Sequence, residues 1–460
     1  MAAETIILRS QRVSLEEETT EGTPVAETAN GAIMTSAEGA EINLDRDLLE
    51  GEMMSGSFSK SAPRAGMWSD DIGITIPTKM RGIGTLGAHG PDWQMLMKSI
   101  MGEELRATEG TLLGTGTAKI PKLKTGLSDI EVGQLLYFKT QDVIRRVVAF
   151  STPDITLDIP LPAISSVDDV VKTGVNWKLS SSASHPIFTA YAYFGDSQGK
   201  RVRLTSCKTT ECAMTFTVGG FCDMAFKSVA LTPLYDTTAQ AITPTYDQAT
   251  QELTCLGVEG FNRVAGTATG TPTQIQTILL APDFDVRVGD DLQAEVSAGV
   301  WETVDITSVS GDAGGNITLG HDSISIALSA TDTCYIMRSA CADTGEELAI
   351  TITADVAYQK CMFASAGKTG IANVGREVTI ESEPYFQGWE QFLMRDEGTA
   401  QQMMVIMGDD DLNIVAVYIS KKINAEVSLT NDDIMKNSVS SRAAKDDILG
   451  DDYELVIAAF

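Results

Sequence analysis

The stretch Ile72-Gly73-Ile74-Thr75-Ile76 places an isoleucine at every second position, with a small or polar residue between each pair. Successive side chains of a β-strand point to opposite faces of the sheet. The spacing therefore predicts a strand with one buried face, which we expect to end at Pro77. The run 423–429 repeats the pattern near the other end of the chain. A β-sheet is the first expectation for this fold.

Further strands are expected throughout the chain, separated by turns rich in glycine, aspartate and serine. They include 6–8, 189–194, 214–218 and 414–419. Numerous short strands with such turns favour sandwiches or barrels over alternating βαβ units. The sequence therefore predicts a mainly β protein.

Two stretches have helical spacing. The first follows Pro91-Asp92 and the second follows Glu383-Pro384, and each carries a tryptophan and further apolar residues three, four or seven positions apart: Trp93, Leu96, Met97 and Ile100; Trp389, Phe392 and Leu393. Apolar residues at this spacing form one face of a helix, and each tryptophan is expected to anchor its helix on a sheet. We expect two β-sandwich or barrel lobes, each with one packed α-helix.

An internal repeat indicates two small β-modules inserted into the lobes. Gly114–Thr117 lies 19 residues before Gly133, and Gly270–Thr273 lies 19 residues before Gly289. Matching segments follow in the same order: 155–157 and 317–319, then Trp177-x-Leu179 and Tyr335-x-Met337. The predicted division is a first lobe over 1–110 and 184–232, a first module over 111–183, a second lobe over 233–265 and 341–460, and a second module over 266–340.

The charge is strongly negative, with 63 Asp and Glu against 34 Lys and Arg, a net charge of −29. Binding to nucleic acid or to an anionic membrane surface needs a basic footprint, so both classes are disfavoured. The start of the chain has no secretion signal, and no apolar run approaches the length that spans a bilayer. The sequence thus favours a protein of a reducing cytoplasm that is not anchored in a membrane.

Motifs for catalysis, cofactors or metals are weak. Gly82-Ile83-Gly84-Thr85-Leu86-Gly87 matches a dinucleotide fingerprint as a string, but no strand–helix unit surrounds it. The histidines His89, His185 and His321 have no nucleophile motif to serve. The acidic runs lack the spacing of a calcium loop; they are Glu16-Glu17-Glu18, Asp409-Asp410-Asp411, Asp446-Asp447 and Asp451-Asp452. We predict no catalytic, cofactor-binding or metal-binding residue, and no enzyme activity.

The seven cysteines show no metal-ligand spacing, and we expect mostly buried thiols: Cys207, Cys212, Cys222, Cys255, Cys334, Cys341 and Cys361. Cys207 and Cys212 are five residues apart within one expected strand. That separation places them on opposite faces, which argues against a disulfide between them.

The opening Val13–Pro24, with its acidic strand and Glu-x-x-x-Gly-Thr-Pro turn, resembles the start of phage tail tube proteins. The segment with Leu48–Gly51, Met80–Gly82 and the Gly-x-x-Trp helix is similar to the same family, as is 188–220. The resemblance covers about 1–110 and 187–262, and 345–460 more loosely. The two modules depart from the family's minimal fold and are expected as outward decorations that tube closure does not require.

The resemblance implies a structural virion protein, the major tail protein of a long-tailed and non-contractile phage, assembled in the host cytoplasm. It implies self-association into stacked rings through sheets joined across subunits, and contacts with the tape measure, tail terminator and distal tail proteins. DNA would pass through the lumen without specific binding, and no cofactor or membrane would take part. Two lobes per chain favour a trimer that acts as a pseudo-hexamer, with six chains as the alternative.

An acidic lumen would keep the phosphates from adhering, with Asp409-Asp410-Asp411 or Glu16-Glu17-Glu18 as candidates for its edge or for loops between rings. Two other classes stay open. A β-sandwich virion or surface adhesion protein that binds a glycan or receptor would also be acidic and lack motifs. A β-rich hydrolase would need a pocket with perturbed titratable groups.

Overall fold

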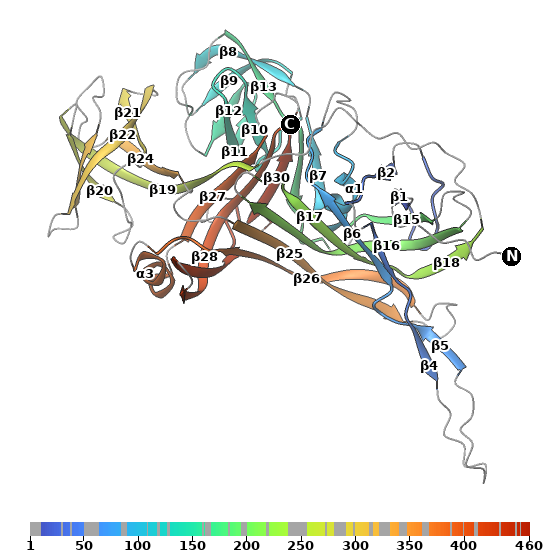
Figure 1. Cartoon of the computed structure of the whole chain (residues 1–460). Coiled ribbons are helices and arrows are strands. Elements are labelled where there is room, and N and C mark those ends of the chain that lie inside the picture. The colour runs from blue at the N-terminus through green and yellow to red at the C-terminus, as the bar shows by residue number, and fades with distance from the viewer. Residues whose placement is uncertain are drawn as a thin grey trace.

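The computed structural model is mainly β, as the sequence predicts, with helices α1 (Gln94–Met101) and α3 (Glu390–Glu397) in its described part (Figure 1). It describes residues 11–460 apart from 29–30, 37–38, 50–63, 84–89, 108, 117–119, 127–128, 159–160, 162–166, 183–184, 195–199, 218–219, 238–254, 272–273, 280–290, 298–299, 312–315, 322–331, 340–346, 361–367, 387–388, 399, 409–412, 432–433, 447–448 and 451. The expected strand at 6–8, His89 and Asp409-Asp410-Asp411 therefore lie outside the described residues.

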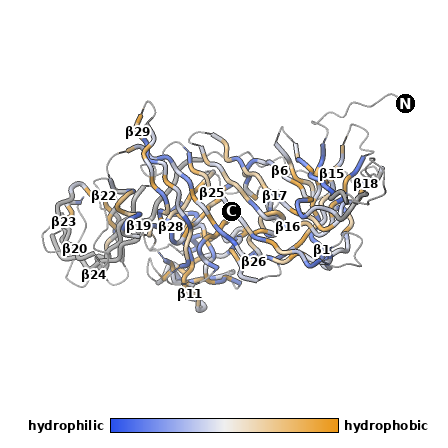
Figure 2. The backbone as a smooth tube through the Cα atoms, turned by 90° about the horizontal axis from the view of Figure 1, so that it is seen from below, coloured by the Kyte–Doolittle hydropathy of each residue, from blue (hydrophilic) through white to orange (hydrophobic). Residues whose placement is uncertain are grey.

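One long antiparallel sheet runs through the molecule. Its strands pair in the order β3, β6, β17, β16, β25, β26, β29, β28, and in Figure 2 the labels of β6, β17, β25 and β28 follow one another across the molecule from right to left. Their bounds are β3 (Glu41–Asn43), β6 (Gly73–Lys79), β17 (Asp223–Val229), β16 (Lys200–Thr217), β25 (Glu347–Lys360), β26 (Lys368–Ser382), β29 (Met435–Ala443) and β28 (Val415–Asn431).

Two further layers branch from the ends of long strands. The first half of β16 pairs with β15 and β18, and β15 continues to β1 and β2. The first half of β28 pairs with β27 and β30, and β30 continues to β14 and β7. The bounds are β1 (Arg12–Glu18), β2 (Ala32–Ile33), β7 (Gly102–Arg106), β14 (Val175–Leu179), β15 (Ile187–Phe194), β18 (Thr232–Asp236), β27 (Ala400–Met407) and β30 (Leu455–Ala459).

Helix α1 lies between these layers. It contacts β16, β14, β7, β15 and β1, and its apolar face is completely buried. The Trp93 ring packs on Trp177 of β14 at 5.0 Å between centroids, and its indole N–H donates to the carbonyl of Arg81 at 3.1 Å. Burial of both rings, with the indole nitrogen satisfied, makes this helix the centre of the main core.

Two six-stranded units have the same order of strand pairing. In the first, β8, β9, β12, β11, β10 and β13 close into a barrel. In the second, the pairs run from β19 to β20, β23, β22, β21, β24 and back to β19. The bounds are β8 (Gly110–Gly116), β9 (Pro121–Thr125), β10 (Leu135–Phe138), β11 (Val143–Ser151), β12 (Asp154–Leu157), β13 (Val167–Lys172), β19 (Cys255–Thr271), β20 (Gln274–Leu279), β21 (Asp291–Ser297), β22 (Val300–Gly311), β23 (Asn316–His321) and β24 (Asp332–Ser339).

Among the matched segments of the sequence repeat that are fully described, one pair falls at equivalent positions of these units and one pair does not. Residues 155–157 form most of β12 and 317–319 lie in β23, which hold the same place in the pairing order. Trp177 and Tyr335 do not correspond, because Trp177 lies in β14, which pairs with β7 and β30 of the main sheet system. The strands of the first barrel thus end at Lys172. In the second unit, β19 is one continuous strand whose first residues pair with β27 and whose last residues pair with β20.

A short hairpin of β4 (Arg46–Leu49) and β5 (Arg64–Trp68) extends from the end that holds β18 (Figure 1). The ribbon of β25 and β26 reaches the base of this hairpin, where Lys360 and Lys368 contact Asp70 at 3.1 and 2.8 Å. The hydrogen bond from Lys368 and the further attraction of both lysines lower the pKa of Asp70 despite its partial burial. The long ribbon is therefore held against the first lobe by charge.

Two local expectations were wrong. Pro77 does not end its strand, because β6 continues to Lys79. The neighbouring β3 pairs only with residues 73–75 of β6, so no strand needs an N–H from Pro77 on that side. Cys207 and Cys212 lie in the same core rather than on opposite faces, because the register of β16 shifts at Thr210, between the two cysteines. This bulge inserts one residue and reverses the alternation. Cys207, Cys212 and Cys222 are buried and form no disulfide, as expected.

Candidate functional site: the polar face of the long sheet

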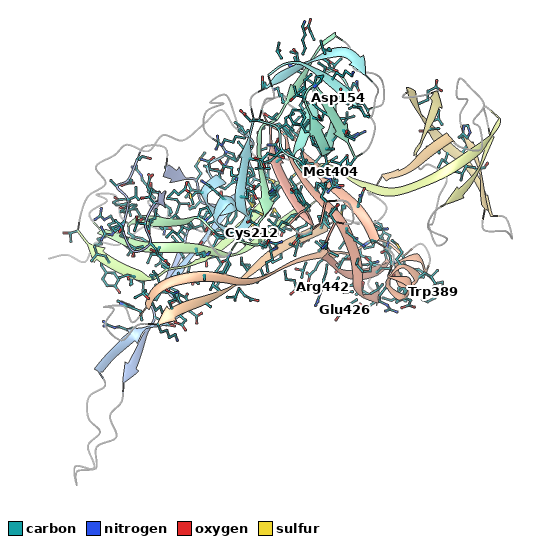
Figure 3. All side chains as sticks on the ribbon, turned by 180° about the vertical axis from the view of Figure 1, so that it is seen from behind. Asp154, Cys212, Trp389, Met404, Glu426 and Arg442 are labelled. Atoms are coloured by element: carbon teal, nitrogen blue, oxygen red, sulfur yellow. The ribbon has the colours of Figure 1, made fainter. Side chains whose placement is uncertain are left out.

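The long sheet has one apolar and one polar face. Alternate residues of its strands, such as Ile76, Cys212 and Ile352, are buried in the main core. The residues between them point the opposite way and stay largely accessible. Figure 3 places Glu426 and Arg442 on this outer side and Cys212 between the layers. A sheet with one solvated face is usual for antiparallel strands, so the composition of that face is the informative feature.

Acids outnumber Lys and Arg on this face, which we call the polar face. Its described acidic residues include Glu41, Glu211, Asp223, Glu347, Asp355, Glu377, Glu381 and Glu426, and its basic residues include Lys79, Lys227, Lys436 and Arg442. Threonine and serine fill most of the remaining positions, among them Thr351, Thr353, Ser438 and Ser440. The face is therefore a hydrophilic surface of negative sign.

Among the contacts described on this face are two ion pairs. Lys79 contacts Asp223 across β6 and β17, and Arg442 contacts Glu377 at 2.9 Å across β29 and β26. Both pairs have side chains more than a quarter exposed, so each contributes little to stability. They neutralise charge locally and leave the surplus of acids on the polar face unchanged.

The two ends of the long sheet carry edge strands. At one end β3 pairs with β6 alone among the described strands, and beside residues 76–79 of β6 the N–H of Ser36 donates to the carbonyl of Pro77 at 2.8 Å. At the other end, residues 424–431 of β28 pair with β29 on one side only within the described part of the chain. Unpaired edge strands offer rows of N–H and C=O groups that can pair with another chain.

The first barrel is attached by a buried charge cluster. Arg146 of β11 contacts Asp446 at 2.9 Å and Asp158 at 3.6 Å, and its guanidinium lies 4.6 Å from the ring of Tyr418 in β28. All three charged side chains are almost inaccessible to solvent. The Tyr418 hydroxyl donates to Asp158 at 3.1 Å, and burial followed by the nearby Asp158 charge raises its pKa. The cluster locks the barrel to the second lobe and is not a solvent-accessible site.

Apolar contacts surround the same junction. Leu135, Tyr137 and Ile144 of the barrel share a cluster with residues of β27, β28 and β30, including Met404, and with Phe460, which follows β30. Figure 3 shows Met404 where the barrel meets these strands. The first barrel is therefore part of the folded core rather than an appendage joined by two chain crossings.

The predicted acidic candidates are not all solvated loops. Glu16–Glu18 belong to β1, where Glu18 is buried and accepts hydrogen bonds from Thr189 and from the N–H and hydroxyl of Ser206, at 2.6 to 2.8 Å. Glu17 is half exposed and pairs with Lys98 of α1 at 2.8 Å. Asp446 is buried, as described above. These acids hold the fold together, and sequence alone did not distinguish them from the acids of the polar face.

His185 lies at a small cavity between the two lobes. The cavity has a volume of about 210 Å³ and is lined by Ser180–Ser182, Asn373 and Arg376, among others. The two ring nitrogens lie 3.2 and 3.0 Å from the carbonyl oxygens of Ser99 and Ser180, and Asn373 lies 2.7 Å from Nδ1. Burial lowers the pKa of His185 despite these hydrogen bonds, and the charges of Lys208 and Arg376 lower it further.

The remaining predicted motifs lie at separate places in the fold. Gly82 donates its N–H to the side chain of Asn413, in a contact that leaves no room for a Cβ, and the following glycines lie outside the described part. His321 is buried in β23. No group of three or more His, Cys, Asp or Glu suited to a metal occurs in the part of the chain that was described, and no helix there is long and apolar enough to span a membrane.

Comparison with known proteins identifies no relative: no protein-family model matches the chain, and no curated protein matches it significantly. The polar face and the sheet edges are the features that sequence reasoning missed. The residues of the polar face alternate with buried residues, as in any strand with one solvated side. Only the pairing of β16 with β25 joins the polar residues of the two halves of the sheet into one surface.

Proposed function

We propose that the chain is a structural subunit of a phage tail tube, which polymerises into stacked rings that conduct the genome. The observation that carries this proposal is the long antiparallel sheet, with an edge strand at each end of its described part and an acid-rich face on one side. The resemblance of 13–24 and 188–220 to tail tube proteins supports it independently. The wall of a tube needs both features. Edge strands let the sheet continue from one copy to the next, and an acid-rich inner face keeps DNA from binding.

The edge strands supply the contacts that a closed wall requires. The β28 edge of one copy would pair with the β3 edge of the next, and repetition of this unlike pair of surfaces closes a ring. The apolar face and α1 would then lie outside the wall, and the polar face would line the channel. Surplus carboxylates on that face would repel phosphates and prevent adhesion during passage.

Three chains per ring remain our preferred stoichiometry, and six chains are the alternative. The sheet passes between the lobes at β16 and β25, with four of its strands from each lobe. Three chains would thus place six lobes around the axis. Stacked rings would meet the tape measure protein inside and the terminator and distal tail proteins at the ends, in the virion tail.

Electron microscopy of negatively stained protein, with native mass spectrometry of released rings, tests this proposal. We expect stacked annular assemblies and a ring mass of three chains. A ring of six chains would overturn the proposed number of chains per ring and leave the tube proposal standing. A chain that stays monomeric at every concentration and with tail initiator present, and that binds a glycan-coated surface, would overturn the tube in favour of an adhesion protein.

A further inference from the structure

The two lobes of the long sheet repeat one arrangement of strands. In the first lobe, β16 pairs near its start with β15 and β18 and near its end with β17, and the ladder continues to β6 and β3. In the second lobe, β28 pairs near its start with β27 and β30 and near its end with β29, and the ladder continues to β26 and β25. Strand β25 of the second lobe therefore corresponds to β3 of the first.

The helices are where the lobes differ. Helix α1 packs on β16 and α3 on β28, but Trp93 is inaccessible whereas Trp389 is 61% exposed, and Figure 3 shows Trp389 at the outer end of the molecule. The prediction that Trp389 anchors its helix on a sheet was therefore wrong. The contact of α3 with β28 is polar instead, with Asn424 donating to the side chain of Gln391 at 2.9 Å. The lobes are thus repeats in their strands.

Irregular positions in the ladders match the two long strands residue by residue. Beside the preceding strand, the register shifts at 204–207 of β16 and at 419–422 of β28. Beside the following strand, the ladder skips Thr210 of β16 and Ala425 of β28. Matching Thr210 with Ala425 also matches 204–207 with 419–422, without a gap. Bulges are specific features of a ladder, so two coincident bulges establish the correspondence.

The correspondence extends to the outer strands. Next to each bulge, Thr209 pairs with Ser228 and Asn424 pairs with Ser441. From these serines the ladders continue through the same residue types: Ser228, Ile74 and Ile42 in the first lobe; Ser441, Ile380 and Ile350 in the second. Ile42 of β3 therefore corresponds to Ile350 of β25.

Within the chain, β25 joins the second lobe to the first. It pairs with the end of β16, where Ile350 lies opposite Met214 and Ile352 opposite Cys212. All four side chains are inaccessible and belong to the main core. The chain thus contains one complete example of a contact between neighbouring lobes.

The corresponding residues lie at the two ends of the long sheet. On β28, Leu429 and Val427 hold the places of the two β16 residues, and Leu429 is 41% exposed whereas its counterpart is inaccessible. At the other end, Ile42 of β3 and the following Leu44 hold the places of the two β25 residues and are half-buried against the main core. Each end therefore presents apolar side chains that have no cross-strand neighbour among the described residues on the open side.

The backbone of β3 is oriented for a partner. The carbonyl of Asp45 accepts at 3.2 Å from the N–H of Ser69, in the segment that leads into β6. Backbone groups of successive strand residues point to opposite edges. The groups of Ile42 and Leu44 therefore point away from β6, to the open side.

Existing contacts define the length of each edge. The N–H and the carbonyl of Ala40 are both bonded to the side-chain amide of Gln11, at 2.7 and 2.8 Å, so the open part of β3 begins at Glu41. On β28, the carbonyl of Val427 accepts from Arg395 at 3.5 Å, a weak contact that an incoming strand can replace.

We propose that β28 of one chain pairs with β3 of the next in the register of the internal β16–β25 junction, with Leu429 opposite Ile42 and Val427 opposite Leu44. The inference rests on the proposed tube function, because it specifies which residues meet in the wall. The contact between two chains thus repeats the contact between two lobes. Every lobe of the ring meets its neighbours through the same pair of strands.

This register keeps the two faces of the sheet separate. Ser428 lies opposite Asn43 and Thr430 opposite Glu41 on the polar face, while the apolar pairs extend the main core. A slip of one residue would place Leu429 opposite a polar residue and move every side chain of the incoming strand to the wrong face.

Disulfide trapping between two variants with different affinity tags tests the register. Ser428→Cys mixed with Asn43→Cys is expected to give a covalent heterodimer on mild oxidation, because directly opposite residues lie about 4.5–5.5 Å apart. Ser428→Cys mixed with Glu41→Cys is the matched control, since that pair would be offset by two residues on the same face and lie beyond about 7 Å. Thr430→Cys with Glu41→Cys is a second pair that should link.

The wild-type chain, oxidised in the same way, accounts for links through native thiols, of which Cys207, Cys212 and Cys222 are buried. Links in the control mixture that equal those of Ser428→Cys with Asn43→Cys would overturn the register. Absence of links in both expected mixtures, with assembled protein present, would overturn it as well.

The apolar side of the contact gives a second measurement. Leu429→Ser should raise the concentration needed for assembly by about tenfold, as expected when an apolar side chain is lost from an interface. Its unfolding temperature as a single chain should stay unchanged, because Leu429 is already 41% exposed. Val374→Ser is the control, at a residue of β26 that is 67% exposed. Equal assembly of the two variants would contradict the proposal.

The register also places Glu426 opposite Asp45, and both side chains are exposed. Like charges directly opposite each other weaken strand pairing. Asp45→Asn should therefore lower the concentration needed for assembly by about threefold at low salt, and the difference should vanish at about 1 M salt, where screening acts within about 3 Å. An unchanged concentration at low salt would count against this register.

The two proposals fail in different ways. Rings whose chains link only in another register would overturn this inference and leave the tube proposal standing. Chains that link through residues 43 and 428 but form open filaments without a channel would uphold the register and overturn the tube. Wild-type protein that never assembles, with variants that never link, would overturn both.

Discussion

Arg146 shows what a single residue contributes at the junction of the first barrel and the second lobe. Its side chain is wholly buried, and its charge is balanced by Asp446 and Asp158. Removal of one partner leaves a buried charge poorly compensated, at a cost on the order of 3 kcal/mol. We therefore expect Asp446→Ala to lower the free energy of unfolding by about that amount, measured by urea denaturation.

The control for this prediction is Asp154→Ala in the same barrel. Asp154 lies 3.7 Å from Lys122, and both side chains are more than 40% exposed. Exposed pairs of this kind contribute about 0–1 kcal/mol. Equal losses in the two variants would show that burial of Arg146 does not matter.

His185 makes stability depend on pH. Its pKa in the folded protein is lowered by burial, with Lys208 and Arg376 nearby. Above a pH of about 6.5 both the folded and the unfolded chain hold the neutral ring, so the residue has no effect there. As the pH falls below that value, the unfolded chain takes up the proton first and stability declines. Thermal unfolding between about pH 7 and 5 should show a smaller decline for His185→Gln than for the wild type. Identical slopes would contradict this assignment.

At the scale of elements, the two six-stranded units differ in how they are attached. The first barrel shares an apolar cluster with β27, β28 and β30, whereas the second unit continues the ladder of β19 and β24. Deletion of 111–172 would expose Met404, Tyr418 and Phe460, and we expect insoluble protein.

Replacement of 265–335 by an Asn-Gly turn joins the paired residues Val264 and Ile336, and we expect a soluble, folded chain. Solubility and circular dichroism of both variants decide this. Soluble protein after the first deletion would restore the expectation that both modules are dispensable.

At the scale of the whole molecule, the sign of the polar face is the feature that the tube proposal depends on. Reversal of two charges with Glu377→Lys and Glu381→Lys should make assembled tubes retain DNA at low salt, because phosphate contacts release counterions. Cosedimentation with duplex DNA at about 0.05 M and 0.2 M salt would measure this, and retention should fall steeply at the higher concentration. Glu109→Lys with Asp129→Lys adds the same charge on exposed sites of the first barrel. Equal retention by both double variants would show that total charge, and not the polar face, governs DNA contact.

The sequence by itself determined the mainly β class, the buried face of β6 and the positions of the two described helices. Ile72, Ile74 and Ile76 predicted the buried side of β6, and the glycine-rich repeat marked strands that hold equivalent places in the two six-stranded units. These features are readable because they depend on alternation and turn chemistry within a few residues. The open edges and the polar face required the pairing of distant strands, which no local pattern contains.

Only the tertiary structure decided which apolar residues are buried. Trp93 and Trp389 begin helices of similar pattern, yet Trp93 is inaccessible and Trp389 is 61% exposed. The local sequence specifies an amphipathic helix in both cases and says nothing of what covers it. The layer of β1 and β15 covers α1, and no described element covers α3 in the same way. Likewise, Glu18 and Glu426 are both glutamates on strands, but the hydroxyl groups of Thr189 and Ser206 surround only Glu18. Burial depends on neighbours that are remote in the chain, and for that reason it is decided by the fold and not by the residue.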